Sequence, residues 1–514
     1  MADPKKILFW PDVYKEQGHW LPTLAWADFI NSYGKLADGK NFEIQYMGIA
    51  DCEEIVENFE TTHPANGDEN KFNYNKIFTE IYREGYTNEV QTTPSSRWKP
   101  DHVWVLAYSG LNDKERKKIS VSDKEDREAE VIRNLFNSYS PDLLVSGYFT
   151  ALETLIIYYN IPKSDHFHDK LKFAISTTYL RHPYEDPASR ALQNLMAFSP
   201  EEQKKLLNIV VRDCSDPKKL LNDPGITLEE FVAPLREFPE FIPCPKIFDY
   251  DSYSAGHGNL VQYDEPCITK ELEAINDSSL EMTWNNILNK PNLIYVTAGS
   301  QVLDYAESSM TLFKSIINAM QASDMKDYHL ILCVGSTLIQ EKWDEHENVT
   351  ICGWAPQRRI LKALSKKNKT SCAIIHGGLA TIKECVYYEI PFLVLPLGKD
   401  QMDNALRLED RGIKNRFHIE YIKPKCLRYF INQIIQDYTS LRNLKKLSSI
   451  FRNSEDLHLG ARKIAHLTEN ENLTNFDPMD ESARAACSQY NEMCKAQAEE
   501  EENSLELNQG SEGI

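Results

Sequence analysis

The sequence predicts an α/β protein made of two tandem domains, each with a parallel sheet covered by helices. The chain has 514 residues, which is too long for one ordinary core, because cores stop growing beyond about 300 residues. Apolar residues make up 42% of it, a globular composition. In both halves, short apolar runs alternate with helical patterns, as expected where each helix connects two parallel strands.

The first half begins with a strand–helix–strand series. The run KKILFWP predicts a buried strand, the polar stretch DVYKEQGHWLP a loop, TLAWADFINSYGKL a helix and NFEIQYMGI a second strand. Residues 60–130 are rich in charge and poor in pattern, which indicates insertions and loops. PDLLVSGYF and KFAIST are further strand candidates. The Pro-rich stretch PLREFPEFIPCPKIF and the tract DYDSYSAGHGNLVQYDEP indicate the end of this domain and a connection.

A second series starts at NLIYVTAGS and continues through YHLILCVGS, NVTICGW, CAIIHGG and PFLVLPL, with helical segments between them. We therefore expect a first domain over residues 1–268 and a second over 269–454. LHLGARKIAHLTE predicts a late helix within a C-terminal helical segment over 455–498. Residues 499–514 are expected to form a disordered acidic tail, because they hold too little apolar surface to pack.

Charge and composition exclude several classes of partner. The net charge of −20 argues against nucleic acid or an anionic membrane as the partner. No run approaches the roughly 20 apolar residues of a membrane span, and MADPKKILFW lacks the long apolar core of a signal peptide. The eleven cysteines are scattered without CxxC pairs, which favours reduced thiols over a disulfide framework. The sequence thus predicts a cytoplasmic protein without a membrane span.

The stretch AIIHGGLATIKECVYYE predicts an anion site. Residues 373–375 indicate a strand, Gly377 and Gly378 allow a sharp turn, and the helix that follows includes Glu384. Such a turn presents unpaired N–H groups and the positive end of the helix dipole, so an acidic protein can bind an anion there. His376 could add a donor to a phosphate oxygen. A plain strand–helix turn with a surface histidine explains these few residues equally well.

The surrounding residues extend this stretch into a wider pattern. It consists of W-x-P-Q in GWAPQ, then H-x-G-x-x-[ST]-x-x-E, P-x-x-x-x-P and D-Q-x-x-N. This pattern resembles the signature of UDP-glycosyltransferases over about residues 291–415, and the resemblance is thin elsewhere. The positions that fall at the family spacing are His376, Thr381, Glu384, Pro391, Pro396, Asp400 and Gln401. Seven positions in one register are far more specific than a single glycine-rich turn.

The resemblance implies a site for a UDP-sugar donor. Trp354 would stack on the uracil, because an aromatic face binds a flat base. Gln357 and Glu384 would hydrogen-bond the ribose hydroxyls, for which a carboxylate is a good acceptor. Asp400 and Gln401 would face the sugar hydroxyls. The residues that follow the histidine and glycine motif depart from the common family pattern, which leaves the identity of the sugar open.

The resemblance also implies where the diphosphate binds. His376, Gly378 and Thr381 would hold it at the helix N-terminus. Gly299 and Ser300, in the segment TAGS after the domain's first strand, match the family's Gly-Ser turn near the phosphates. That match is weak by itself, because many strands end in Gly-Ser. The family transfers sugars without a metal, so neither a metal nor a cofactor is expected besides the UDP-sugar co-substrate.

The first half carries a second match, since Gly18-His19-x-x-Pro22 resembles the family's G-H-x-x-P segment, whose histidine is the catalytic base. An acceptor hydroxyl must lose its proton as it attacks the anomeric carbon, and a histidine with a pKa near 7 is suited to this. By itself, a loop histidine more often caps a helix. The implied reaction is an inverting transfer, in which the helix dipole stabilises the departing diphosphate.

The usual carboxylate partner of this base has no obvious counterpart. The family pattern would place an Asp at Gly147, and Asp142 sits earlier in the expected strand. Either another carboxylate substitutes, or the base works unaided on an acidic acceptor such as a phenol. The stretch SDHFHD, with His166 and His168, could suggest a metal. Without a third region of ligands, a polar loop or the rim of the acceptor pocket is the better interpretation.

The resemblance implies the GT-B fold, in which two Rossmann-like domains face each other across a cleft. The acceptor would bind the first domain and the donor the second. The protein would be a hexosyltransferase that moves a sugar from a UDP-sugar to a hydroxyl of a small, apolar or phenolic acceptor. The alternatives are a UDP-sugar epimerase on the same fold and a degenerate binding module without turnover, which Gly147 favours. The acceptor and the oligomeric state stay open.

Overall fold

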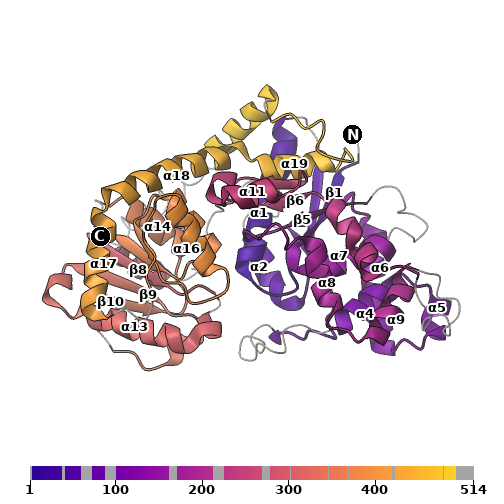
Figure 1. The fold of residues 1–514 in the computed structure, drawn as a ribbon, viewed down its shortest axis with the longest axis horizontal. Helices are drawn as coiled ribbons and strands as arrows, with labels where there is room; N and C mark the ends of the chain where they lie inside the picture. Colours follow the sequence, from indigo (N-terminus) through magenta and orange to yellow (C-terminus); the bar gives the residue numbers. More distant parts are fainter. Residues whose placement is uncertain are drawn as a thin grey trace.

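The computed structural model contains two α/β domains that lie side by side (Figure 1). The first is built on a seven-stranded sheet and the second on a five-stranded sheet, and the paired strands of both are parallel. The predicted pair of Rossmann-like domains is therefore confirmed. The structure describes residues 3–37, 41–59, 72–86, 100–160, 171–211, 225–268, 278–300, 302–344, 346–367, 370–418, 423–478 and 480–493.

The first sheet has the strand order β3-β2-β1-β4-β5-β6-β7. Its strands are β1 Lys5–Trp10, β2 Phe42–Gly48, β3 Asn73–Lys76, β4 Leu143–Gly147, β5 Lys172–Ser176, β6 Glu240–Ile242 and β7 Val261–Tyr263. The order reverses between β1 and β4, which pair in register from Ile7 with Leu143. In an open parallel sheet, ligands bind beyond the carboxyl ends of the strands at such a switch point.

Ten helices among the described residues surround this sheet or extend from it. They are α1 Gln17–Ala37, α2 Glu53–Glu57, α4 Asp101–Ser109, α5 Asp113–Lys118, α6 Asp123–Tyr139, α7 Ala151–Asn160, α8 Pro187–Leu195, α9 Pro200–Val211, α10 Leu228–Val232 and α11 Asp251–Gly256. α1 begins six residues earlier than predicted, so His19 lies in the first turn of a helix and not in a loop. Pro22 lies inside α1, where its missing N–H removes one hydrogen bond of the helix without ending it.

The expectation of loops over residues 60–130 is wrong at β3 and again from residue 101, where the chain forms α4, α5 and the first two turns of α6. Capping boxes define two of these helix starts. The Asn112 side chain caps α5 together with Glu115, and the Ser122 side chain caps α6 together with Glu125. This S/N-x-x-E signal is visible in the sequence, but the high charge of the segment conceals its buried face. Residues 60–71 and 87–99 lie outside the described part.

The second sheet has the order β10-β9-β8-β11-β12 and switches direction between β8 and β11. Its strands, all five of them predicted, are β8 Asn292–Thr297, β9 Tyr328–Cys333, β10 Val349–Cys352, β11 Cys372–Ile375 and β12 Phe392–Val394. The helices of this domain are α12 Ser278–Leu288, α13 Ala306–Met320, α14 Gln357–Ser365, α15 Leu379–Tyr387, α16 Gln401–Asp410 and α17 Pro424–Gln436. The proposed anion turn joins β11 to α15 and thus lies at the switch point.

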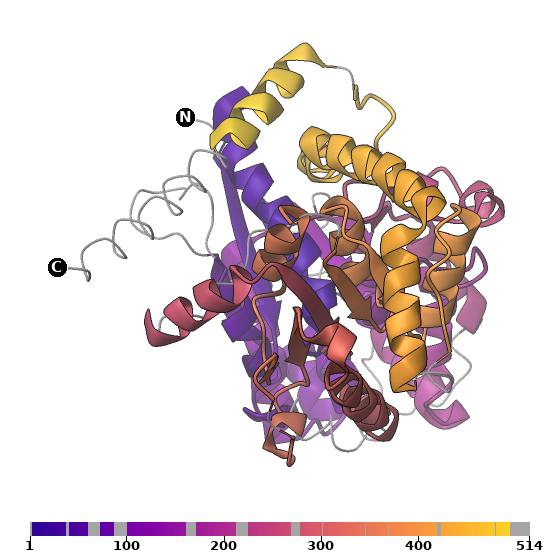
Figure 2. The same ribbon diagram turned by 90° about the vertical axis from the view of Figure 1, so that its left-hand side faces the viewer.

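The C-terminal helices return to the first domain (Figures 1 and 2). α18 Tyr438–Leu457 packs against α15 of the second domain, and α19 Leu459–Leu467 packs against α1 of the first. Ile464 of α19 and Tyr490, on a helix over residues 481–493, are buried in the core of the first domain. The Tyr490 hydroxyl donates to Asp28 Oδ2 over 2.7 Å. The late helix is confirmed, and the 499–514 tail lies outside the described residues.

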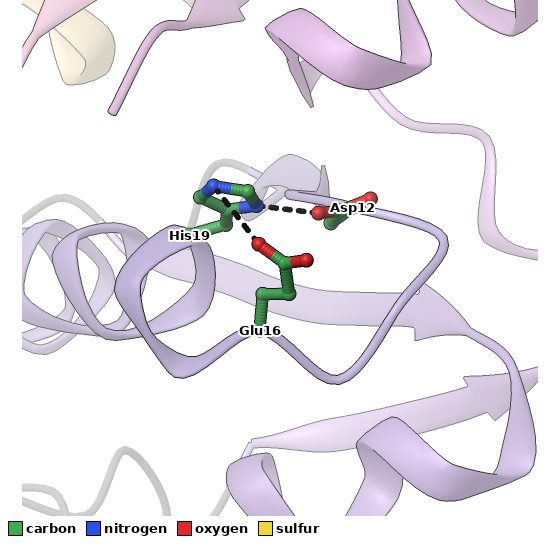
Figure 3. Close-up of side chains that lie close together, drawn as sticks. All are labelled: Asp12, Glu16 and His19. Atoms are coloured by element: carbon green, nitrogen blue, oxygen red, sulfur yellow. Dashed lines mark hydrogen bonds and ion pairs between the residues drawn. The ribbon is translucent and has the colours of Figure 1, made fainter. Parts of the chain in front are cut away.

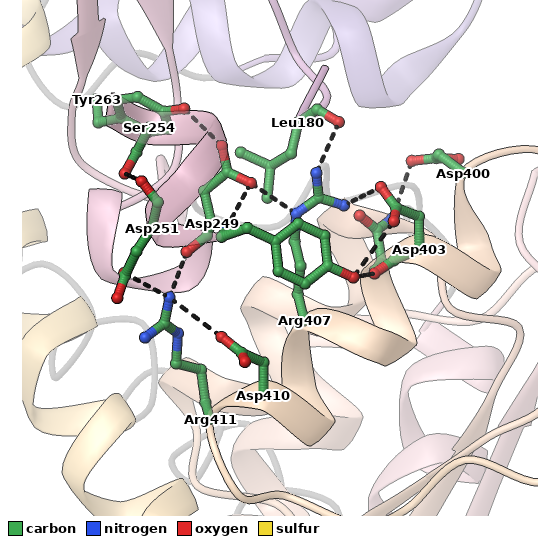
Figure 4. A network of polar contacts seen from close by, with 12 residues as sticks. Leu180, Asp249, Asp251, Ser254, Tyr263, Asp400, Asp403, Arg407, Asp410 and Arg411 are labelled. Carbon is green, nitrogen blue, oxygen red and sulfur yellow. Dashed lines mark hydrogen bonds and ion pairs between the residues drawn. The ribbon is translucent and has the colours of Figure 1, made fainter. Parts of the chain in front are cut away.

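A buried ionic network also links the domains (Figure 4). Arg407 of α16 donates from Nε to Asp249 Oδ1 of the first domain over 2.7 Å, and its guanidinium lies 4.6 Å from the ring centroid of Tyr250. The same guanidinium donates to the Leu180 carbonyl and pairs with Asp403. Because burying an unpaired charge is costly, this network favours one relative placement of the two domains. Among the described residues, no helix combines the length and apolarity that a membrane crossing requires.

Candidate active site

A cleft of about 1190 Å³ lies between the domains, and residues of both line it. It contains every residue that the sequence predicted for the site, although these positions span most of the chain. They are His19, Gly299, Ser300, Trp354, Gln357, His376, Gly378, Thr381, Glu384, Asp400 and Gln401. The fold thus brings the first-domain histidine to the same cavity as the motif of the second domain.

His19 is paired with a carboxylate that the sequence did not single out (Figure 3). Asp12, in the loop between β1 and α1, hydrogen-bonds His19 Nδ1 through its Oδ2. The Asp12 side chain is buried, and its Oδ1 accepts from the Tyr14 N–H over 3.2 Å. A carboxylate at Nδ1 favours the tautomer with the proton on that nitrogen. Nε2 is then left with the lone pair that a general base needs.

The structure also explains why Gly147 cannot supply this partner. A Cβ at Gly147 would lie 1.7 Å from the Pro11 carbonyl oxygen, so no side chain fits there. The cause is the pairing of β1 with β4, which places the loop after β1 directly against the end of β4. Asp12 follows Pro11, and it is this carboxylate that contacts His19. Asp142 has another role, because its Oδ2 accepts from the Lys6 N–H over 2.8 Å.

A second carboxylate faces the other ring nitrogen. Glu16 Oε2 lies 3.6 Å from His19 Nε2 (Figure 3). Burial lowers the pKa of His19, but the charge and hydrogen bond of Asp12, with the charge of Glu16, outweigh burial and raise it to about 8. The imidazole of the free protein is therefore a stronger base than an ordinary histidine. A rising fraction becomes unprotonated as the pH approaches 8.

Asp12, Glu16 and His19 also offer ligand atoms that lie within 4.8 Å of one another, a spacing that could hold a metal ion. Of the described residues, only this group has that spacing. Imidazole and carboxylate are ligands that zinc accepts. The expected metal independence therefore stays a prediction. The other metal candidate, His166 with His168, lies outside the described residues.

The residues predicted to hold the base and ribose lie together on the second domain. Trp354 is 51% exposed, unusual for a residue of its size, and lines the cleft. Gln357 donates from Nε2 to Glu384 Oε2 over 2.5 Å and accepts from the Tyr295 hydroxyl over 2.9 Å. Glu384 Oε1 accepts from Arg358 Nε over 2.7 Å. These bonds hold the carboxylate at the cleft wall, and the sequence pattern did not reveal Arg358.

His376 is held between two glycines. A Cβ at Gly299 would lie 2.5 Å from His376 Cε1, and a Cβ at Gly378 would lie 2.5 Å from Nε2, so the ring needs both positions to lack a side chain. Burial and the nearby Lys399 lower the pKa of His376 to about 4, and the imidazole is neutral at physiological pH. Its Nδ1 is buried. α15 begins directly after Gly378 and directs its first N–H groups to this point.

The end of the cleft predicted for the sugar is built by the start of α16. Asp400 Oδ2 accepts from Asn404 Nδ2 over 2.9 Å. Gln401 Oε1 accepts from the N–H of Leu397 over 2.8 Å and of Gly398 over 3.1 Å, so this oxygen holds the preceding loop. Lys399 also lines the cleft, where its Nζ pairs with Asp304 Oδ2 over 2.8 Å. Lys399 was not predicted from the sequence, because a lone lysine carries no pattern.

Comparison with known proteins agrees with this geometry. The family model described as UDP-glucoronosyl and UDP-glucosyl transferase matches residues 342–456. This match and the relatives that follow support the assignment of the chain to the UDP-glycosyltransferase superfamily. Within the superfamily, it is 25% identical over 168 residues to the putative UDP-glucuronosyltransferase ugt-50 of Caenorhabditis elegans, a match of 32% of this chain and 30% of the relative. It is 30% identical over 133 residues to UDP-glycosyltransferase stmC of Aspergillus ustus, a match of 25% of this chain and 24% of the relative.

These sequence matches therefore span less than a third of either relative of the superfamily. The fold likeness covers far more. The crystal structure of the glycotransferase of kitacinnamycin superposes with a TM-score of 0.57 at 15% identity, over 91% of this chain and 99% of that one. At such low identity the likeness shows the fold alone, and it confirms the GT-B arrangement of two Rossmann-like domains.

Proposed function

We propose that the protein transfers a sugar from a UDP-sugar to a hydroxyl of a small acceptor, with inversion at the anomeric carbon. One observation carries the proposal: the His19–Asp12 pair of the first domain and the His376 turn of the second line the same cleft. The pair has the chemistry of a general base with an orienting carboxylate. The turn has the chemistry of a diphosphate site. A UDP-sugar bound at the turn extends toward the base.

The donor would bind along the second domain. Trp354 offers an exposed aromatic face to the uracil, and Gln357 with Glu384 offers acceptors to the ribose hydroxyls. The first turn of α15, the His376 side chain and the Gly299–Ser300 turn would surround the diphosphate. Asp400 and Gln401, at the start of α16, would face the sugar hydroxyls.

The reaction would be a single displacement. The acceptor O–H gives its proton to His19 Nε2 while its oxygen forms a bond to the anomeric carbon. The bond from that carbon to the diphosphate oxygen breaks, and UDP leaves with the electron pair. Asp12 stabilises the imidazolium that forms, and the N-terminus of α15 with Lys399 stabilises the charge on the departing diphosphate.

Under this proposal no divalent metal is required, because helix dipole, imidazole and lysine take the place of a cation at the diphosphate. We also propose a cytoplasmic location, which the acidic composition and the many free thiols support. Fractionation of cells that express the full chain tests the location. Turnover in the presence of EDTA tests whether the reaction requires a metal.

His19→Ala tests the function. UDP release from UDP-glucose or UDP-glucuronic acid, measured with a mixture of phenols, should fall by roughly 10² or more in this variant. Calorimetry should show unchanged UDP affinity, because the base contacts the acceptor and not the nucleotide. His346→Ala is the matched control, since His346 lies away from the cleft and bonds Gln321. Wild-type turnover in His19→Ala would overturn the assignment. UDP binding by the wild-type protein without UDP release would favour the binding module.

A further inference from the structure

The first-domain half of the cleft has an aromatic wall beside the base. Phe149, just after β4, lies 5.0 Å from the His19 ring centroid at an interplanar angle of 23°. It also stacks on Tyr179 at 5.7 Å and 25°. All three rings line the cleft. Because aromatic faces stack well on one another, this wall suits a flat aromatic acceptor whose hydroxyl points at His19.

A cation contacts the same wall. The guanidinium carbon of Arg190, on α8, lies 5.1 Å from the Phe149 centroid. Its Nε is buried, and no group in the described ranges accepts from that N–H. No carboxylate of the described chain pairs with this guanidinium either. Since His19 and Arg190 both contact the Phe149 ring, one aromatic molecule with a substituent at each end can reach both.

The other charges in this half of the cleft differ from Arg190, because each has a partner of opposite charge or an imidazole. The pairs are Asp12 and Glu16 with His19, Glu54 with Lys15, and Glu153 with His102. In a protein with a net charge of −20, carboxylates are abundant. A partly buried guanidinium without one is costly, and the cost is recovered when a ligand supplies the anion.

Asn194 adds a second donor next to Arg190. It lies four residues further along α8, so the two side chains project from the same face of the helix. Asn194 is 9% exposed, its Nδ2 is buried, and nothing described in the structure accepts from it. Both residues line the cleft. Two donors without acceptors on one helix face match the two oxygens of a carboxylate.

We propose that the acceptor is a hydroxylated aromatic carboxylic acid of the hydroxybenzoate class. Its carboxylate binds Arg190 and Asn194, its ring lies on Phe149, and its hydroxyl reaches His19. This inference rests on the proposed function. The hydroxyl proton passes to His19 Nε2, the phenolic oxygen bonds the anomeric carbon, and UDP leaves with the electron pair of the broken bond. The carboxylate takes no part in the bond changes, so the product is a phenolic glycoside with a free carboxylate and not a sugar ester.

The test compares 4-hydroxybenzoate with its methyl ester, which keeps the ring and the hydroxyl but lacks the charge. We expect the acid to have the higher kcat/KM by about tenfold or more, as for a hydrogen bond to a charged group. The ester's hydroxyl is the more acidic, so intrinsic reactivity would give the opposite order. In Arg190→Gln the preference for the acid should disappear while turnover of the ester is kept, and Arg190→Lys should keep part of it. Arg236→Gln is the matched control, because Arg236 pairs with Asp186 outside the cleft.

Calorimetry on the UDP-loaded protein separates this inference from the proposed function. If neither acceptor releases UDP, but the acid binds wild type and binds Arg190→Gln at least about tenfold more weakly, the acceptor site stands and the catalytic proposal fails. The inference is overturned if the wild-type protein binds the acid and the ester with equal affinity. It is also overturned if Arg190→Gln weakens the binding of acid and ester by the same factor. A sugar ester as the main product, identified by mass spectrometry and alkaline hydrolysis, overturns the orientation of the acceptor.

Discussion

Asp12→Asn is the perturbation that tests the base most directly, because it changes charge without changing size. The asparagine can still contact Nδ1 of His19, but it no longer stabilises the imidazolium. If its amide N–H turns toward Nδ1, the proton moves to Nε2 and the base is lost. Burial still lowers the pKa of His19, and only the more distant Glu16 opposes it. We therefore expect the pKa to fall from about 8 to below its ordinary value of 6.5.

The magnitude follows from that difference. A fall of at least about 1.5 in pKa corresponds to about 2 kcal/mol less stabilisation of the protonated ring, at 1.36 kcal/mol for each pH unit. The loss of the correct tautomer adds to it, so turnover should fall by roughly 10² to 10³ at pH 8. The assay is UDP release between pH 5.5 and 9.5. Wild-type kcat/KM should rise with pH through about 8, and the rise should move below pH 6.5 in Asp12→Asn.

Asp142→Asn is the matched control, because Asp142 also belongs to the first domain and accepts from a backbone N–H, but does not line the cleft. In Asp142→Asn, kcat/KM should still rise with pH through about 8, even if the variant is less stable. UDP affinity should be equal in all three proteins. A pH limb that stays near 8 in Asp12→Asn would refute the reasoning, since it would show that Asp12 does not control the protonation of His19.

Three further outcomes are expected. Glu384→Ala should weaken UDP binding about tenfold or more in calorimetry, which is about 1.4 kcal/mol. The control Glu409→Ala removes the partner of Arg416 outside the cleft and should leave UDP affinity unchanged. Equal UDP affinities of Glu384→Ala and wild type would contradict the assignment of Glu384 to the ribose. Turnover should be unchanged in EDTA, and a full loss restored by magnesium, manganese or zinc would instead assign an ion to Asp12, Glu16 and His19. Burial and the neighbouring Glu265 raise the pKa of Glu455 to about 8, so the folded state keeps a proton that the unfolded chain releases near pH 4.5. The stability from this proton is full below about pH 4.5 and is lost as the pH rises through 8. Thermal unfolding of Glu455→Gln, which cannot ionise, should therefore show a smaller decline in Tm from pH 5 to 9, and the wild-type slope would contradict this.

Much of this protein could be predicted from the sequence, because the relevant signals are local. Buried parallel strands are short apolar runs, and in the second domain their number and their positions along the chain follow directly from the sequence. The donor motif is also local, since His376, Gly378 and Thr381 form one strand–turn–helix connection. The rule that ligands bind at the carboxyl ends of strands then places His19 in the same cleft. The prediction of loops after residue 60 missed β3, a short and polar strand, and it missed the helices from residue 101, because high charge hid their single buried face.

The sequence by itself therefore determined the strands of the second sheet, four of the seven strands of the first and the residue types of the donor turn, since backbone periodicity and motif spacing are properties of contiguous segments. Only the tertiary structure decided which side chains from distant segments contact one another. The Pro11 carbonyl leaves no room for a side chain at Gly147, on the neighbouring strand, and Asp12 is the carboxylate that contacts His19. Arg190 of α8 contacts Phe149, whose ring stacks on His19, and α19 returns across the domain boundary to pack on α1. These contacts depend on how distant segments pack against one another, and no period or spacing along the chain encodes the distance between two such side chains.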